Sequence, residues 1–230
     1  MTDQRPTLVL VHGAWHLPST WDLLRGELDT LGYPSLAVKL PTSGPDAHGG
    51  VPDDAEVIRA ACEGVDGPVV VIAHSYGGIP ATEAVAGLPR VRRLIYVAAF
   101  VPDVGESMYT MVGAPEPDAV EGMFPISDDP RAQLYADVPE AVADLALGRL
   151  VDQHHRSFAD WVTRAGWHTV PSSYVVTEQD ASLAVPVQER LAARTEDVRR
   201  IATSHSPHLS RPAELAALID DMVRDRPSGP

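Results

Sequence analysis

The sequence has one cysteine, no long apolar run and few basic residues, and each shortage argues against a class of protein. With Cys62 alone, no intramolecular disulfide can form, and a zinc site built from thiolates is disfavoured. No apolar run approaches the length of about 18 residues that crosses a membrane. Lysine and arginine number 18 against 32 aspartate and glutamate residues, and the net charge of −14 argues against binding to nucleic acid or to anionic membranes.

The remaining composition is that of a globular protein. Hydrophobic residues make up 44% of the chain and charged residues 22%, which argues against disorder and fibrous repeats. A length of 230 residues suits a single domain with an insertion. The first residues lack the apolar stretch of a signal peptide, so we expect a cytoplasmic protein.

Short apolar, β-branched runs alternate with segments of helical period along most of the chain. The runs predict strands at 7–11, 35–38, 68–73, 93–98, 173–177 and 198–202. Helices are expected at 19–31, 53–63, 77–86, 187–193 and 212–223, with Ser210 as the cap of the last one. This alternation predicts an α/β fold, a mostly parallel sheet flanked by helices on both faces. Such sheets bind ligands at the carboxyl ends of their strands.

The alternation stops between Asp103 and Gly166, where we find no strand run but several helix candidates. We interpret 103–166 as a helical cap inserted into a core made of 1–102 and 167–230. Methionine adapts to irregular shapes, so the apolar residues of this segment are candidates for the wall of a substrate pocket. The candidates in this segment are Met108, Met111, Met123 and Phe124, and Trp15, which follows the first strand, is a further candidate pocket residue.

A candidate nucleophile follows the strand at 68–73. The sequence Ala73-His-Ser-Tyr-Gly77 is similar to the G-x-S-x-G nucleophile elbow, in which a serine occupies a sharp turn between strand and helix. Ala73 stands in place of the first glycine. The start of the following helix would favour negative charge near Ser75. A plain helix cap is the alternative interpretation of Ser75.

The residues after the first strand are candidates for an oxyanion hole. Gly13 allows the backbone to turn tightly toward Ser75. The main-chain N–H groups of Ala14 and Tyr76 are then expected to point at one spot, where they would stabilise an oxyanion. We interpret the neighbouring His12 as a buried structural histidine.

A serine nucleophile needs a base, and the base needs an orienting acid. In the chain order serine, acid, histidine, Asp180 follows the strand at 173–177 and His205 follows the strand at 198–202. Glu178 and Asp103 are alternative acids, and His208 is an alternative base.

These stretches together resemble the α/β-hydrolase superfamily, in particular its group of small esterases and hydroxynitrile lyases. The matching segments are Leu8–Trp15, Val71–Gly78, Tyr96–Asp103, Val176–Asp180 and Ser204–Pro212. The resemblance implies that Ser75 is the nucleophile, His205 the base and Asp180 the acid. The lyases carry a threonine at the position of Gly13 and a lysine at that of Ser206, so these two departures favour hydrolysis.

We therefore expect a serine hydrolase without cofactor or metal that cleaves a small-molecule carboxylic ester through an acyl-enzyme intermediate. A thioester or lactone hydrolase acting on a pathway intermediate is an alternative. A ligand-binding protein that retains a hydrolase pocket is another. The oligomeric state stays open, with a homodimer among the candidates.

Overall fold

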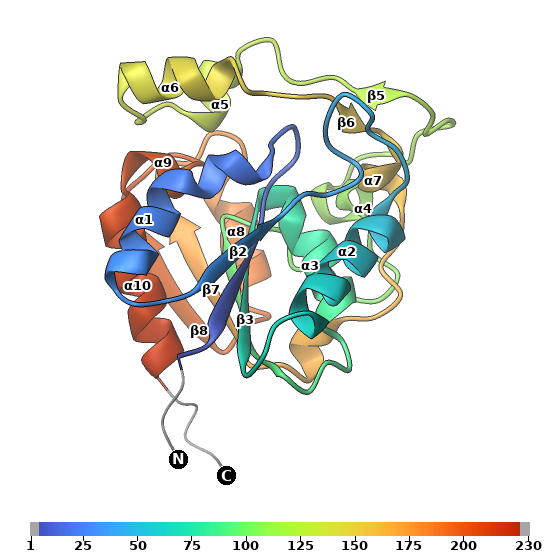
Figure 1. Cartoon of the computed structure of the whole chain (residues 1–230). Coiled ribbons are helices and arrows are strands. Elements are labelled where there is room, and N and C mark those ends of the chain that lie inside the picture. Colours follow the sequence, from blue (N-terminus) through green and yellow to red (C-terminus); the bar gives the residue numbers. More distant parts are fainter. Residues whose placement is uncertain (1–4, 226–230) are drawn as a thin grey trace.

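A parallel sheet of six strands forms the centre of the protein, whose computed structural model describes residues 5–225 (Figure 1). The strand order is β2-β1-β3-β4-β7-β8, and every neighbouring pair is parallel. The expected fold class is confirmed. The strands are β1 (Thr7–Val11), β2 (Ser35–Val38), β3 (Val69–His74), β4 (Val91–Val97), β7 (Ser172–Thr177) and β8 (Asp197–Ile201).

The register of the strands aligns their carboxyl ends. Ala73 of β3 pairs with Val11 of β1 on one side and with Tyr96 of β4 on the other. On the far side of β4, Val97 pairs with Val175 of β7. The residues that follow these strands therefore meet at one edge of the sheet, which is where ligands bind in such folds.

Helices cover both faces of the sheet because successive strand residues point to opposite sides. Leu8 and Leu10 pack with α1 (Asp22–Thr30) and α10 (Pro212–Arg224), whereas Val9 and Val11 face the opposite core. That opposite core includes residues of α2 (Val51–Glu63), α3 (Gly78–Val85) and α8 (Val185–Ala192). Figure 1 shows the sheet between α1 and α10 on one side and α2 and α3 on the other.

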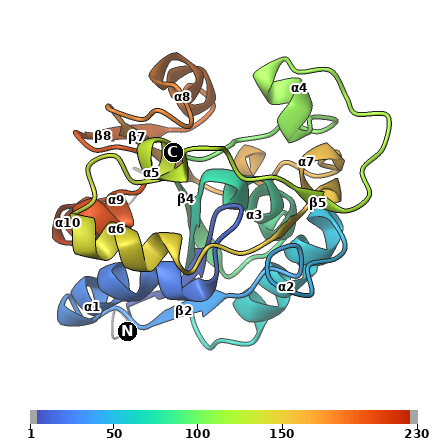
Figure 2. The same cartoon turned by 90° about the horizontal axis from the view of Figure 1, so that it is seen from above.

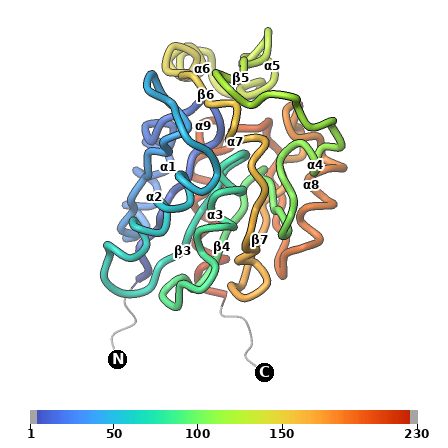
Figure 3. Tube along the Cα trace, turned by 90° about the vertical axis from the view of Figure 1, so that its right-hand side faces the viewer, coloured from blue at the N-terminus to red at the C-terminus, as the bar shows by residue number. Residues whose placement is uncertain are grey.

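The segment 103–166 lies largely over the carboxyl edge of the sheet, at the end opposite the chain termini (Figures 1 and 3). Seen from above, α5 and α6 lie near α9 and α10, whereas β5 and α7 lie near α2 (Figure 2). Its elements are α4 (Met108–Val112), β5 (Met123–Phe124), α5 (Pro130–Leu134), α6 (Glu140–Leu147), β6 (Gln153–His154) and α7 (Arg156–Ala159).

The expectation that this segment contains no strand is wrong. Strands β5 and β6 pair in antiparallel fashion, and Ser43 adds a single bridge to Gln153 of β6. Each strand has two residues, which is too short for an alternating pattern to be visible in the sequence.

The expected cap of the last helix is also wrong. Ser210 ends the short helix α9 (Pro207–Ser210), and α10 begins directly after Arg211, whose φ of −138° breaks the two helices apart. No side chain caps α10, although Pro212 occupies its first turn as expected. Short 3-10 helices complete the fold: η1 (Pro18–Trp21), η2 (Ser75–Gly77) and η3 (Gly166–His168). Within residues 5–225, no helix has the length and apolar character needed to cross a bilayer.

Candidate active site

Ser75 occupies a tight turn between β3 and the helical segment η2–α3. Its φ of 53° lies in the left-handed region, which non-glycine residues rarely adopt. A Cβ atom on Gly77 would lie 2.5 Å from the main-chain oxygen of His12, and one on Gly78 would lie 2.1 Å from that of Phe100. Both glycines are therefore required for the close approach of the helix, and the expected strand–turn–helix arrangement around Ser75 is present. Ala73 is fully buried within β3, where its methyl group is accommodated.

Asp180 and His205 are in direct contact at the ends of β7 and β8. The Nδ1 atom of His205 lies 2.7 Å from Oδ2 of Asp180, and the two side chains are 2% and 0% exposed. The other carboxylate oxygen, Oδ1, accepts hydrogen bonds of 2.8 Å from the main-chain N–H groups of Ser182 and Leu183. Burial opposes ionisation of Asp180, but the charge of His205 and these hydrogen bonds outweigh it and lower the pKa of the carboxyl group.

His205 also lies next to the turn that carries Ser75. His74, the residue before Ser75, makes a hydrogen bond of 2.8 Å through Nε2 to the main-chain oxygen of His205. The rings of His74 and His205 are 4.7 Å apart between centroids. Within the described residues, no hydrogen bond joins the hydroxyl of Ser75 to His205. The structure thus brings the acid and the histidine together beside the turn and leaves the hydroxyl of Ser75 without a bond to the imidazole.

The alternative acids and the alternative base make other contacts. Asp103 is partly exposed and pairs with His168, whose ring nitrogen lies 3.0 Å from Oδ1 and lowers the pKa of that carboxyl group. Glu178 is exposed. His208 is buried, and its Nε2 lies 3.0 Å from the hydroxyl of Thr20. In the part of the chain that the structure describes, Asp180 is the one candidate acid that contacts His205.

The chain after β1 passes directly beside Ser75. A Cβ atom on Gly13 would lie 3.1 Å from Cβ of Ser75, so any side chain there would crowd the serine. Neither the N–H of Ala14 nor that of Tyr76 donates to an acceptor among residues 5–225. That these two groups bind an oxyanion stays a prediction. The main-chain oxygen of Ala14 forms a hydrogen bond of 2.6 Å with Nδ1 of His16.

Two histidines of this loop are buried and neutral. His12 is fully buried, its Nδ1 lies 2.9 Å from the main-chain oxygen of Gly13, and its Nε2 accepts from the N–H of Leu40 at 3.3 Å. Burial lowers the pKa of both His12 and His16 to about 4. With both ring nitrogens occupied, His12 has the structural role expected for it.

Trp15 contacts a cluster of aromatic residues from the segment 103–166. Its Nε1 donates to the main-chain oxygen of Phe124 at 3.1 Å, and its ring lies 5.7 Å from that of Phe158. Met111 is buried, whereas Met123 is 45% exposed. Met108 is half-buried against the same core. That these residues line a substrate pocket stays a prediction.

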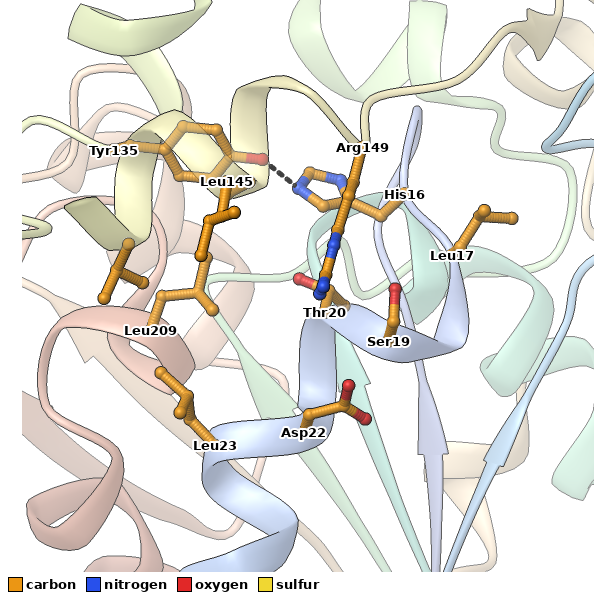
Figure 4. A pocket seen from close by; sticks show the side chains of 12 residues that line it. His16, Leu17, Ser19, Thr20, Asp22, Leu23, Tyr135, Leu145, Arg149 and Leu209 are labelled. Carbon is orange, nitrogen blue, oxygen red and sulfur yellow. Dashed lines mark hydrogen bonds between the residues drawn. The ribbon is translucent and has the colours of Figure 1, made fainter. Parts of the chain in front are cut away.

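A pocket lined by His16 lies between η1 and α6 (Figure 4). Its walls are largely apolar, with Leu145 and Leu209 among them, and the side chain of Arg149 also lines it. The hydroxyl of Tyr135 lies 2.7 Å from Nε2 of His16 within it. Ser75 does not line this pocket. Within the described range, no group of three or more metal-ligating side chains occurs.

One buried acid next to the turn at Ser75 was not predicted from the sequence. Asp54 is fully buried and accepts hydrogen bonds from the hydroxyl of Tyr76 at 2.6 Å and from the hydroxyl and N–H of Thr42 at 2.6 and 3.1 Å. Burial raises the pKa of Asp54 to about 7, against the effect of these bonds. A signal was present, since Asp54 stands at helical spacing between the buried apolar residues Val51 and Ile58.

Comparison with known proteins identifies the family. The model of the alpha/beta hydrolase family matches residues 8–218. The chain is 32% identical over 240 residues to the alpha/beta hydrolase nvfD of Aspergillus novofumigatus, covering 94% of this chain and 95% of that protein. It is 25% identical to Methylesterase 7 of Arabidopsis thaliana, covering 92% and 94% of the two chains. The crystal structure of the methylesterase MES16 from Arabidopsis superimposes with a TM-score of 0.81 at 23% identity, covering 95% of this chain and 98% of the other. The chain belongs to the alpha/beta hydrolase family.

Proposed function

We propose that the protein hydrolyses a small-molecule carboxylic ester through an acyl-enzyme formed on Ser75, with His205 as the base and Asp180 as the orienting acid. The observation that carries this proposal is the buried contact of 2.7 Å between His205 and Asp180 beside the turn that holds Ser75 at a φ of 53°. A purely structural role for these residues would not require a strained serine next to a buried pair of imidazole and carboxylate.

The first half of the reaction forms the acyl-enzyme. Asp180 accepts the Nδ1–H of His205, so the lone pair of the imidazole is at Nε2. As Oγ of Ser75 attacks the acyl carbon, Nε2 takes the hydroxyl proton and the carbonyl electrons move onto oxygen. The N–H groups of Ala14 and Tyr76 hold this oxyanion. The bond to the alcohol then breaks, and the departing oxygen takes the proton from Nε2.

The second half releases the acid and restores the enzyme. Nε2 of His205 takes a proton from water while the water oxygen attacks the acyl carbon. The bond between the acyl carbon and Oγ of Ser75 breaks, and Oγ recovers the proton from Nε2. The products are one carboxylic acid and one alcohol, with no cofactor consumed.

The segment 103–166 serves as the cap of the site in this proposal. Trp15 and Phe124, which share a hydrogen bond, would form one wall of the substrate pocket, and Met108, Met111 and Met123 would contribute to the others. Similarity to Methylesterase 7 makes methyl esters the first substrates to test. A homodimer and a cytoplasmic location stay predictions from the sequence.

The test is to compare the native protein with Ser75→Ala on a panel of nitrophenyl and methyl esters. We expect Ser75→Ala to lose essentially all turnover, and a fluorophosphonate to add once to the native protein, at Ser75, as located by peptide mass. Ser210→Ala is the matched control, because Ser210 is a half-buried residue of α9 whose hydroxyl has no hydrogen-bond partner within the described residues, and this variant should retain full turnover. Turnover by Ser75→Ala at the native rate would refute the proposal.

A further inference from the structure

A buried polar network connects strand β6 to the two sides of the candidate active site. Gln153 is fully buried, and its amide uses its full hydrogen-bonding capacity. Its Oε1 accepts from the main-chain N–H of Trp15 at 3.2 Å and from the hydroxyl of Ser43 at 2.6 Å. Its Nε2 donates to the hydroxyl oxygens of Thr42 at 3.0 Å and Ser157 at 2.7 Å.

Thr42 extends this set of bonds to the elbow. Its hydroxyl donates to Oδ2 of Asp54 at 2.6 Å, and the same oxygen accepts from the hydroxyl of Tyr76 at 2.6 Å. We call Gln153, Thr42, Asp54 and Tyr76 the Gln153–Asp54 network. It begins at the N–H of Trp15 and ends at the side chain of Tyr76, without a gap in hydrogen bonding.

Both ends of the network adjoin a main-chain N–H group that is free to bind an oxyanion. The N–H of Trp15 belongs to the peptide group that begins at Ala14, and the other end is the side chain of Tyr76 itself. The backbone is also strained near each end of the network, because Trp15 has a φ of 60° and Ser75, the residue before Tyr76, has a φ of 53°. Strained residues persist only where surrounding contacts hold them, and fully satisfied buried networks supply such contacts.

We propose that Gln153 and Asp54 are positioning residues that hold the N–H groups of Ala14 and Tyr76 in the orientation needed to bind the oxyanion. This inference rests on the proposed function. Because Gln153 comes from the segment 103–166, that segment helps to build the oxyanion hole as well as covering the site. Neither residue need touch the substrate.

The first test disrupts each end of the network, through one hydrogen bond at Tyr76 and the four of the amide at Gln153. Tyr76→Phe deletes the hydroxyl that donates a hydrogen bond to Asp54. Gln153→Met deletes the amide while keeping a side chain of similar length. Loss of a whole oxyanion donor lowers kcat by about 100- to 1,000-fold, so we expect misplacing one to lower kcat by about 10- to 100-fold. KM for the same ester should change by less than about threefold, because the donors act chiefly on the transition state.

Tyr33→Phe is the matched control. The hydroxyl of Tyr33 donates to Oδ1 of Asp220 at 2.7 Å, which is the same kind of phenol–carboxylate bond as that between Tyr76 and Asp54. It lies between the end of α1 and α10, away from Ser75. Tyr33→Phe should leave kcat within about twofold of the native value, although both phenylalanine variants lose a hydrogen bond from a phenol to a carboxylate. Thermal unfolding of each variant establishes that kinetics are measured on folded protein.

The double variant Tyr76→Phe/Gln153→Met decides whether the residues act as one unit. We expect its kcat to fall by less than the product of the two single effects, because either change already releases the network. Native kcat in both single variants, next to an inactive Ser75→Ala, would overturn this inference and leave the proposed function intact. Native turnover by Ser75→Ala would overturn the proposed function and this inference with it.

Discussion

Nδ1 of His205 lies 2.7 Å from Oδ2 of Asp180, although 25 positions separate the two residues in the chain. The contact exists because β7 and β8 are parallel neighbours, so that the residues following each strand meet at the same edge of the sheet. Both side chains are withdrawn from solvent, where a hydrogen bond from an imidazole N–H to a carboxylate is stronger than it is in water.

Asp180→Asn should lower kcat by about four orders of magnitude, because an amide can donate to Nδ1 of His205 and stabilise the wrong tautomer. Steady-state kinetics on an activated ester measure the effect. The variants Asp103→Asn and Glu178→Gln are the controls and should stay within about twofold of the native kcat, since neither acid contacts His205. If either control lost more kcat than Asp180→Asn, the residue changed in that control, and not Asp180, would be the orienting acid.

Acid should destabilise the protein as the pH falls from about 6.5 toward 4. Burial lowers the pKa of four histidines, His12 and His16 to about 4 and His74 and His208 well below the usual value. In this range the unfolded chain binds protons that these four groups in the folded chain do not, so the free energy of unfolding falls with pH.

Asp54 has the opposite effect on the free energy of unfolding over a similar range of pH. Its raised pKa means that the folded protein binds a proton that the unfolded chain has lost, which favours folding at lower pH. Each unit of pKa difference corresponds to about 1.4 kcal/mol per group, so four histidines outweigh one carboxyl group. Urea unfolding at pH 7 and pH 5 measures the balance, and an equal or higher free energy of unfolding at pH 5 would contradict the prediction.

Gly78→Ala should destabilise the protein by about 3 kcal/mol or more, because the new methyl carbon would lie 2.1 Å from the main-chain oxygen of Phe100. The free energy of unfolding in urea is the measurement. Gly26→Ala is the matched control. Gly26 is exposed within α1 with no atom near the added carbon, so this variant should be stabilised by up to about 1 kcal/mol.

The thiol of Cys62 should be unreactive in the folded protein. It is fully buried, and burial raises its pKa to about 12, so almost no thiolate exists at pH 8. An aromatic disulfide reagent releases one equivalent of its own aromatic thiol when it reacts with Cys62. We expect less than one equivalent over an hour with the native protein and one full equivalent in urea. Rapid stoichiometric reaction of the native protein would contradict the burial of this residue.

The elements that create the candidate site could be predicted where the signal is local. The apolar run of β3, the glycines after Ser75 and the order of Ser75, Asp180 and His205 are all readable along the chain. Local patterns also mislead where two elements are nearly continuous. Ser210 has the chemistry of a helix cap, but α9 and α10 are separated only by Arg211, and the serine is used to end α9.

The fold class, the strand ends near the candidate site and a short list of candidate side chains could be predicted from the sequence, because hydrophobic period and turn residues act over a few positions. The contact of His205 with Asp180, and not with Glu178 two positions earlier, depends on how β7 and β8 pack together. The tertiary structure also decided that Gln153 bonds to the N–H of Trp15 across 138 positions. Such contacts depend on how packed elements orient individual side chains, and no local pattern records that orientation.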